Sequence, residues 1–112
     1  MIRIAVCYDS THIVKKLEKI ITNKFNNYTM NFEIHLFHDG TSLLKQYGIK
    51  SFDVIFLGID MPDLSGFDVA RTIRNLHSDS YIIFVTGNSE HVYKSFDFQP
   101  FHFIRAKCEI HL

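Results

Sequence analysis

The segment FDVIFLGIDMPDLSGF, residues 52–67, contains an apolar run, a loop with proline and glycine, and the start of a helix. Its first six residues are mostly apolar, which is typical of a strand buried on both faces of a parallel sheet. Pro62 and Gly66 punctuate the loop that follows. The strand ends at Gly58, so its last position carries no side chain.

Four other short apolar runs resemble this strand in length and in branched or aromatic content. They are residues 2–7, 30–37, 81–85 and 100–104. Residues 23–29 are polar and predict a connection, whereas helical spacing begins after Ser10, at Leu43, at Phe67 and after Ser89. Strands that alternate with helices, without hairpin signals, predict an α/β domain: an open, doubly wound parallel sheet with helices on both faces.

The length and the charge balance restrict the function. A chain of 112 residues is one domain, and its 12 Lys and Arg residues balance 12 Asp and Glu residues. It therefore lacks the positive field that would bind nucleic acid or an anionic membrane by itself. With no signal peptide, no membrane-spanning run and no disulfide framework, the sequence predicts a cytoplasmic protein.

A ligand site in such a sheet lies beyond the carboxyl ends of the strands. The residues found there are Tyr8 and Asp9 after the first strand, Gly58 to Asp60 at the third, Thr86 at the fourth, and Ala106 and Lys107 after the fifth.

Five motifs follow this arrangement: IAVCYD at residues 4–9, IFLGIDMP at 55–62, LSGF at 64–67, IIFVT at 82–86 and FHFIR at 101–105. In their order and spacing they resemble the receiver domain of bacterial two-component response regulators, most closely those of the LytTR type. The resemblance covers essentially the whole chain. It implies a flavodoxin-like, five-stranded sheet with strand order 2-1-3-4-5, and a single receiver-like domain, residues 1–112, at the N-terminal end of a longer regulator.

In that family a histidine kinase transfers a phosphoryl group to an aspartate at the end of the third strand. Two acidic residues after the first strand hold Mg²⁺ with it, a Thr or Ser follows the fourth strand, and a Lys follows the fifth. Clustered carboxylates bind a hard cation that neutralises the transferred group, while the hydroxyl and the ammonium bind phosphoryl oxygens.

Compared with this pattern, the chain has a degenerate phosphorylation pocket. The acceptor position is Gly58, which cannot form an acyl phosphate. Tyr8 stands at the first acidic position, and only Asp9 remains at the second. Thr86 keeps the hydroxyl, and the lysine position is Ala106.

Two nearby residues do not restore the pocket. Lys107 would replace the missing lysine only after a slip of one residue along the strand. Asp60 aligns two residues beyond the acceptor, where the family uses a main-chain carbonyl as metal ligand. Asp9 and Asp60 would therefore hold Mg²⁺ weakly or not at all, since this ion prefers octahedral oxygen coordination. We expect no resident cofactor.

Structural roles also fit these residues. Gly58 suits a tight turn, and Asp9 suits the start of a helix, whose dipole favours a carboxylate. Tyr8 fills the space left by the missing acidic side chains, with its ring over Gly58.

Four phenylalanines near the end of the chain predict an interface: Phe96, Phe98, Phe101 and Phe103. The resemblance places the family's dimer or partner face on the fourth helix, fifth strand and fifth helix. The chain stops at Leu112, so we expect the fifth helix to be truncated or absent. The apolar surface would then be exposed, covered by the remainder of a longer protein, or paired with a protein partner or a second copy.

These observations favour a non-enzymatic pseudo-receiver that acts by protein–protein contact in phosphorelay signal transduction and transcription regulation. The alternative is a phosphorylatable receiver, served by a histidine kinase, that uses Asp60 or another carboxylate. A flavodoxin-like cofactor binder fits less well, because residues 7–12, CYDSTH, contain no glycine for a phosphate loop.

Overall fold

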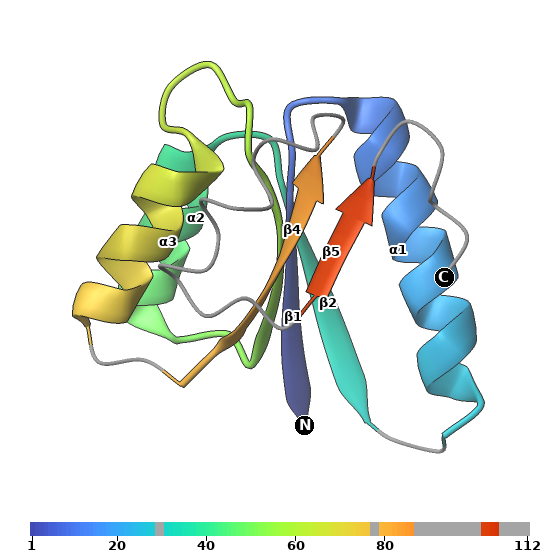
Figure 1. The fold of residues 1–112 in the computed structure, drawn as a ribbon. Helices are drawn as coiled ribbons and strands as arrows, with labels where there is room; N and C mark the ends of the chain where they lie inside the picture. Colours follow the sequence, from blue (N-terminus) through green and yellow to red (C-terminus); the bar gives the residue numbers. More distant parts are fainter. Residues whose placement is uncertain (29–30, 77–78, 87–101, 106–112) are drawn as a thin grey trace.

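The computed structural model of the chain describes residues 1–28, 31–76, 79–86 and 102–105, and of Thr86 and residues 102–105 it describes the backbone alone. Strands and helices alternate along these residues (Figure 1). The elements are β1 (Ile2–Cys7), α1 (Thr11–Asn26), β2 (Phe32–Phe37), α2 (Gly40–Ile49), β3 (Val54–Gly58), α3 (Gly66–Asn75), β4 (Tyr81–Thr86) and β5 (His102–Arg105).

The strands form one parallel sheet in the order β2-β1-β3-β4-β5, which agrees with the predicted open sheet. Helix α1 covers one face, and α2 and α3 cover the other (Figure 1). The chain winds outward in one direction from β1 to β2 and in the other from β3 to β4. The carboxyl ends of β1 and β3 therefore meet at the point where the winding reverses, the usual place for a site in such sheets.

The core consists of two layers, one on each side of the sheet. Alternate residues of a strand point to opposite faces, so Ala5 and Cys7 pack toward α2 and α3, while Ile4 and Val6 pack toward α1. All four side chains are fully buried. Burial on both faces explains why β1, β3 and β4 appear as continuous apolar runs in the sequence.

Two helix boundaries differ from the sequence prediction. The polar connection predicted at residues 23–29 begins later, because α1 continues to Asn26 and the ring of Phe25 packs on Phe32 at 5.3 Å between centroids. Helix α2 begins at Gly40 instead of Leu43, because the Asp39 carboxylate accepts a hydrogen bond from the backbone N–H of Ser42 at 2.7 Å.

Several predicted features lie outside the described residues. These are the helix expected after Ser89, the truncated or absent fifth helix, Ala106 and Lys107, and the interface residues Phe96, Phe98 and Phe101. Phe103 lies in β5, of which the backbone alone is described. Within the described parts of the chain, none of the helices combines the length and apolar character needed to cross a membrane.

Candidate functional site

The predicted site residues that the structure describes lie at the carboxyl edge of the sheet. Tyr8 and Asp9 follow β1, Gly58 ends β3 with Asp60 two residues later, and Thr86 ends β4. We call this group, Tyr8, Asp9, Gly58, Asp60 and Thr86, the strand-tip site. Cys7 lies opposite Leu57 in the β1–β3 pairing, so Tyr8 and Gly58 are the next residues along two adjacent strands.

The ring of Tyr8 lies directly on Gly58. A Cβ atom at position 58 would be 1.8 Å from Tyr8 Cδ1 and 2.6 Å from Cε1, far inside van der Waals contact. The Tyr8 backbone N–H donates to the carbonyl of Phe37 at 3.1 Å, which holds the residue at the end of β1. The expectation that the ring stands over Gly58 is therefore met, and position 58 has no room for a side chain while Tyr8 keeps this placement.

Electrostatics around Tyr8 favour its neutral form. Partial burial raises the pKa of the Tyr8 hydroxyl, and the nearby charges of Asp9 and Asp60 raise it further. Both carboxylates are exposed, and Asp9 stands one residue before Ser10, the N-cap of α1, whose hydroxyl accepts from Ile13 N–H at 3.3 Å. A protonated phenol thus lies beside two solvated carboxylates.

The loop after β3 runs back tightly against the start of α3. Ile59 is 1% exposed, its N–H donates to the Val85 carbonyl at 3.2 Å, and its own carbonyl accepts from Gly66 N–H at 2.7 Å. A Cβ atom at Gly66 would be 2.2 Å from the Gly58 carbonyl oxygen. Because these contacts involve backbone atoms, the loop can lie this close to the start of α3 only if residue 66 has no side chain.

Asp63, which the sequence did not single out, joins this loop to α2. Its carboxylate accepts hydrogen bonds from Gly40 N–H at 3.2 Å, Thr41 N–H at 3.0 Å and the Thr41 hydroxyl at 2.6 Å. Hydrogen bonds hold the pKa of the Asp63 carboxyl well below its usual range. The largest contribution comes from the Thr41 hydroxyl, and smaller ones come from backbone N–H groups, including that of Leu64. These partners make Asp63 a structural link between the loop and the helix.

Cys7 has no chemical role that its surroundings would support. Its thiol is fully buried, contacts the Asp39 carbonyl at 3.4 Å and lies 3.7 Å from Met61 Sδ. Burial raises the pKa of the thiol to about 12, with smaller contributions from Asp39 and Asp63. Since the thiolate is the reactive form and the metal ligand, a thiol held protonated in this way is poorly suited to act as a nucleophile or to bind a metal.

The strand-tip site does not fit the magnesium ion that the resemblance implies. Among residues 1–28, 31–76 and 79–86, no three His, Cys, Asp or Glu side chains gather where they could hold a metal. Asp9 and Asp60 remain near the strand ends, but the Tyr8 ring lies over the position from which a third carboxylate would extend. Two carboxylates without a third make a poor site for a hard, strongly hydrated cation.

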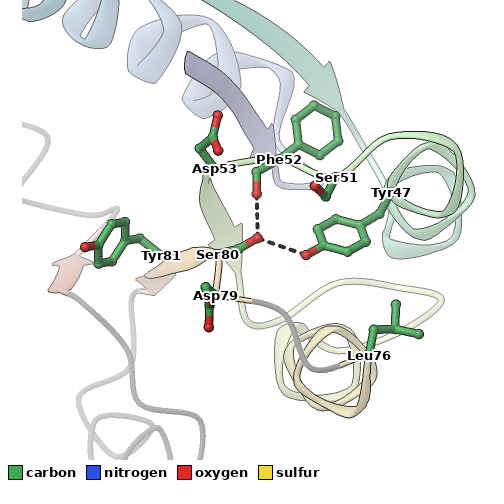
Figure 2. A pocket seen from close by; sticks show the side chains of 8 residues that line it. All are labelled: Tyr47, Ser51, Phe52, Asp53, Leu76, Asp79, Ser80 and Tyr81. Carbon is green, nitrogen blue, oxygen red and sulfur yellow. Dashed lines mark hydrogen bonds between the residues drawn. The ribbon is translucent and has the colours of Figure 1, made fainter. Parts of the chain in front are cut away.

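A cavity of about 380 Å³ lies at the other end of the sheet, beside the start of β3 and β4 (Figure 2). The Ser80 side chain, 7% exposed, donates to the Phe52 carbonyl and shares a hydrogen bond of 2.9 Å with the Tyr47 hydroxyl. Arg74 donates to the Ser80 carbonyl at 2.8 Å. The remaining lining residues are Ser51, Asp53, Leu76, Asp79 and Tyr81. The sequence contained no sign of this cavity, because two loops distant in sequence form it.

Comparison with known proteins agrees with this fold. The family described as the response regulator receiver domain matches residues 4–104. This chain therefore belongs to the response regulator receiver domain family.

Relatives in sequence are bacterial proteins, among them two whose names describe them as transcriptional regulators. Over 68 residues, 61% of this chain, it is 34% identical to Protein MrkE of Klebsiella pneumoniae and to the transcriptional regulatory protein YpdB of Escherichia coli. Over 89 residues, 79% of this chain, it is 32% identical to the cell cycle transcriptional regulator CtrA of Caulobacter vibrioides. The matched part covers 25%, 28% and 36% of these three relatives, so the chain corresponds to a minor part of their length.

Solved structures share the fold over nearly the whole chain. The response regulator TrrA of Thermotoga maritima, in complex with Mg²⁺ and beryllium fluoride, has a TM-score of 0.78 and 27% identity, and covers 92% of this chain and 84% of its own. The activated DrrB receiver domain, with BeF₃, has a TM-score of 0.81 and 23% identity, covering 98% of this chain and 88% of its own. The second likeness supports the fold alone.

Proposed function

We propose that this receiver domain is a pseudo-receiver, which acts in two-component signalling and transcription regulation through protein contact without accepting a phosphoryl group. The observation that carries the proposal is Gly58, because the acceptor position of the family pattern holds no carboxylate. Tyr8 supports it, since its ring stands where a side chain at position 58 would begin. The proposal includes a non-enzymatic role in the cytoplasm.

Asp60 carries the competing proposal of a phosphorylatable receiver. Its carboxylate lies near enough to Tyr8 to affect the pKa of the hydroxyl. The orientation of the residues after β3 disfavours phosphorylation at Asp60. Ile59 points into the core, and Asp60 is exposed and faces away from the buried layer at the end of β3. Phosphorylation at Asp60 would require a different path for the loop that Ile59 and Gly66 hold together.

Partners belong to the proposal as well. We place contact with a protein partner or a second copy on the fourth-helix and fifth-strand face, which contains Phe96, Phe98, Phe101 and Phe103. A histidine kinase partner goes with the competing proposal. The LytTR assignment rests on the motifs at residues 4–9 and 101–105, and a full-length gene that encodes a basic, β-rich domain after the receiver would support it.

The test is exposure of the purified chain to acetyl phosphate and, separately, to beryllofluoride, each with Mg²⁺. We expect an unchanged intact mass and an unchanged amide spectrum by NMR. The DrrB receiver domain, whose activated form contains BeF₃, is the positive control under the same conditions. A stable adduct of one phosphoryl group would contradict the pseudo-receiver, and its loss in an Asp60→Asn variant would assign the acceptor to Asp60.

A further inference from the structure

The closest contacts that a side chain at position 58 would meet all come from one residue, Tyr8. Among the described residues, the three atoms nearest to a Cβ at Gly58 are Cδ1, Cε1 and Cγ of Tyr8, at 1.8, 2.6 and 2.8 Å. The backbone of Gly58 is ordinary strand and does not adopt the left-handed conformation that would require glycine. The glycine is therefore explained by its neighbour's ring and not by a turn.

A backbone hydrogen bond and a packing contact place the Tyr8 ring at this position. The Tyr8 backbone is bonded to Phe37 of β2, and the half-buried ring packs at the edge of the core layer under α1. Asp9 and Asp60 flank it, and their charges favour the protonated phenol. A neutral, amphipathic ring suits this position, with its apolar surface on Gly58 and its hydroxyl near solvated carboxylates.

We infer that Tyr8 is a built-in occupant of the strand-tip site, and that positions 8 and 58 form one coupled unit in which the ring replaces the side chain at the end of β3. In the structure the ring fills this space, with its Cδ1 atom 1.8 Å from where a Cβ at position 58 would lie. Tyr8 is thus a positioning residue that keeps the ends of β1 and β3 in one arrangement. This inference deepens the proposed function, and its regulatory meaning rests on that function. Because Tyr8 fills the strand-tip site, no ligand bound there would switch the domain.

A double-mutant cycle tests the coupling. Gly58→Ala is made in the wild-type chain and in a Tyr8→Ala background, and thermal unfolding is measured for all four proteins. With Tyr8 present, we expect Gly58→Ala to lower the midpoint by about 8 °C or more, because the new methyl displaces the ring. In the Tyr8→Ala background the same change should shift the midpoint by less than about 2 °C. Equal shifts in the two backgrounds would overturn the inference.

Two further comparisons keep the test decisive: the folding of the double variant and the effect of Gly58→Ala in a Tyr8→Phe background. If Gly58→Ala does not fold, folding of the Tyr8→Ala/Gly58→Ala double variant supports the inference, and a double variant that is equally unfolded overturns it. Tyr8→Phe keeps the ring, so Gly58→Ala in that background should remain as damaging as in the wild type. This test and the phosphorylation assay can fail independently. A phosphoryl adduct would contradict the pseudo-receiver proposal but would leave the coupling between positions 8 and 58 unchanged. Absence of that coupling would overturn this inference but would leave the intact mass after acetyl phosphate treatment unchanged.

Discussion

The two ends of the sheet use space and polar groups in opposite ways. At the amino end a cavity of about 380 Å³ remains open, and the buried Ser80 hydroxyl beside it is fully engaged with Phe52 and Tyr47. At the carboxyl end Gly58 and Gly66 are crowded by neighbouring atoms at less than 3 Å from where a Cβ would lie. The carboxyl end of the sheet, where the family's phosphorylation site lies, is thus more tightly packed than the amino end.

This difference shows that a strand end without a side chain, as at Gly58, need not leave an empty space. Protein interiors are close-packed, so the space of a missing side chain tends to be taken by another. Here Tyr8 lies over Gly58, whereas Asp9 and Asp60 stay in solvent. Buried polar groups at the amino end instead contribute through satisfied hydrogen bonds, which are costly to break. The two ends should therefore respond differently to substitution.

The largest effect is expected from Gly66→Ala at the carboxyl end. The added methyl would meet the Gly58 carbonyl oxygen at 2.2 Å and Ile59 Cα at 2.8 Å, and backbone atoms cannot move aside. We expect a loss of about 3 kcal/mol in the free energy of unfolding, measured by chemical denaturation.

Gly48→Ala is the matched control, because this helical glycine of α2 has no atom within 4 Å of an added Cβ. It should raise the free energy of unfolding by about 0.5–1 kcal/mol, since alanine favours helix. Similar losses in Gly48→Ala and Gly66→Ala would contradict the crowding at the carboxyl end.

Ser80→Ala tests the amino end and should cost about 2 kcal/mol, because it removes a buried partner from the Phe52 carbonyl and the Tyr47 hydroxyl. Tyr47→Phe removes only one of these bonds and should cost about 1 kcal/mol. Denaturant unfolding of both variants measures the difference. A neutral Ser80→Ala would mean that the network at the cavity contributes nothing to stability.

Asp39→Ala should have a smaller effect, about 1 kcal/mol, because it removes the N-cap of α2. Asp39→Asn retains an acceptor for the Ser42 N–H and should remain close to the wild type in the same unfolding assay. Equal losses in the two variants would point to the carboxylate charge in place of the cap.

The smallest effect is the pH dependence that Asp63 contributes. Its folded pKa lies below the unfolded value, which is about 3.9 for aspartate, so the carboxylate stabilises the fold above that pH. This stability is lost as the pH falls through the folded pKa. From about pH 5 downward, the wild type should therefore lose stability more steeply than Asp63→Asn. Parallel pH profiles of the two proteins would show that Asp63 is not held as the structure places it.

Most of the fold follows from local patterns. The β1 and β4 runs are apolar because they are buried on both faces, and their predicted limits at residues 2–7 and 81–85 agree with the structure to within one residue. The α1 end was placed wrongly because Phe25 gains its contact with Phe32, a residue of another element. Local polarity carries no information about such a contact.

The part of the site that lies at the strand ends could be predicted from the sequence. The parts formed where two loops meet could not. Parallel strands bring Tyr8 and Gly58 together, so their contact follows from the order of the chain. Asp63 could not be singled out, since its partners Gly40 and Thr41 precede it by more than twenty residues. The cavity at Ser80 depends on two loops whose approach no sequence pattern encodes.

The ring of Tyr8 on Gly58 also has a consequence for how such a domain changes through descent. Restoring an acceptor aspartate at position 58 would place a carboxylate into an occupied space, so that change alone would be harmful before it could be useful. Tyr8 would have to be replaced as well. Under the proposed function, an aspartate introduced at position 58 alone would therefore not restore phosphoryl acceptance.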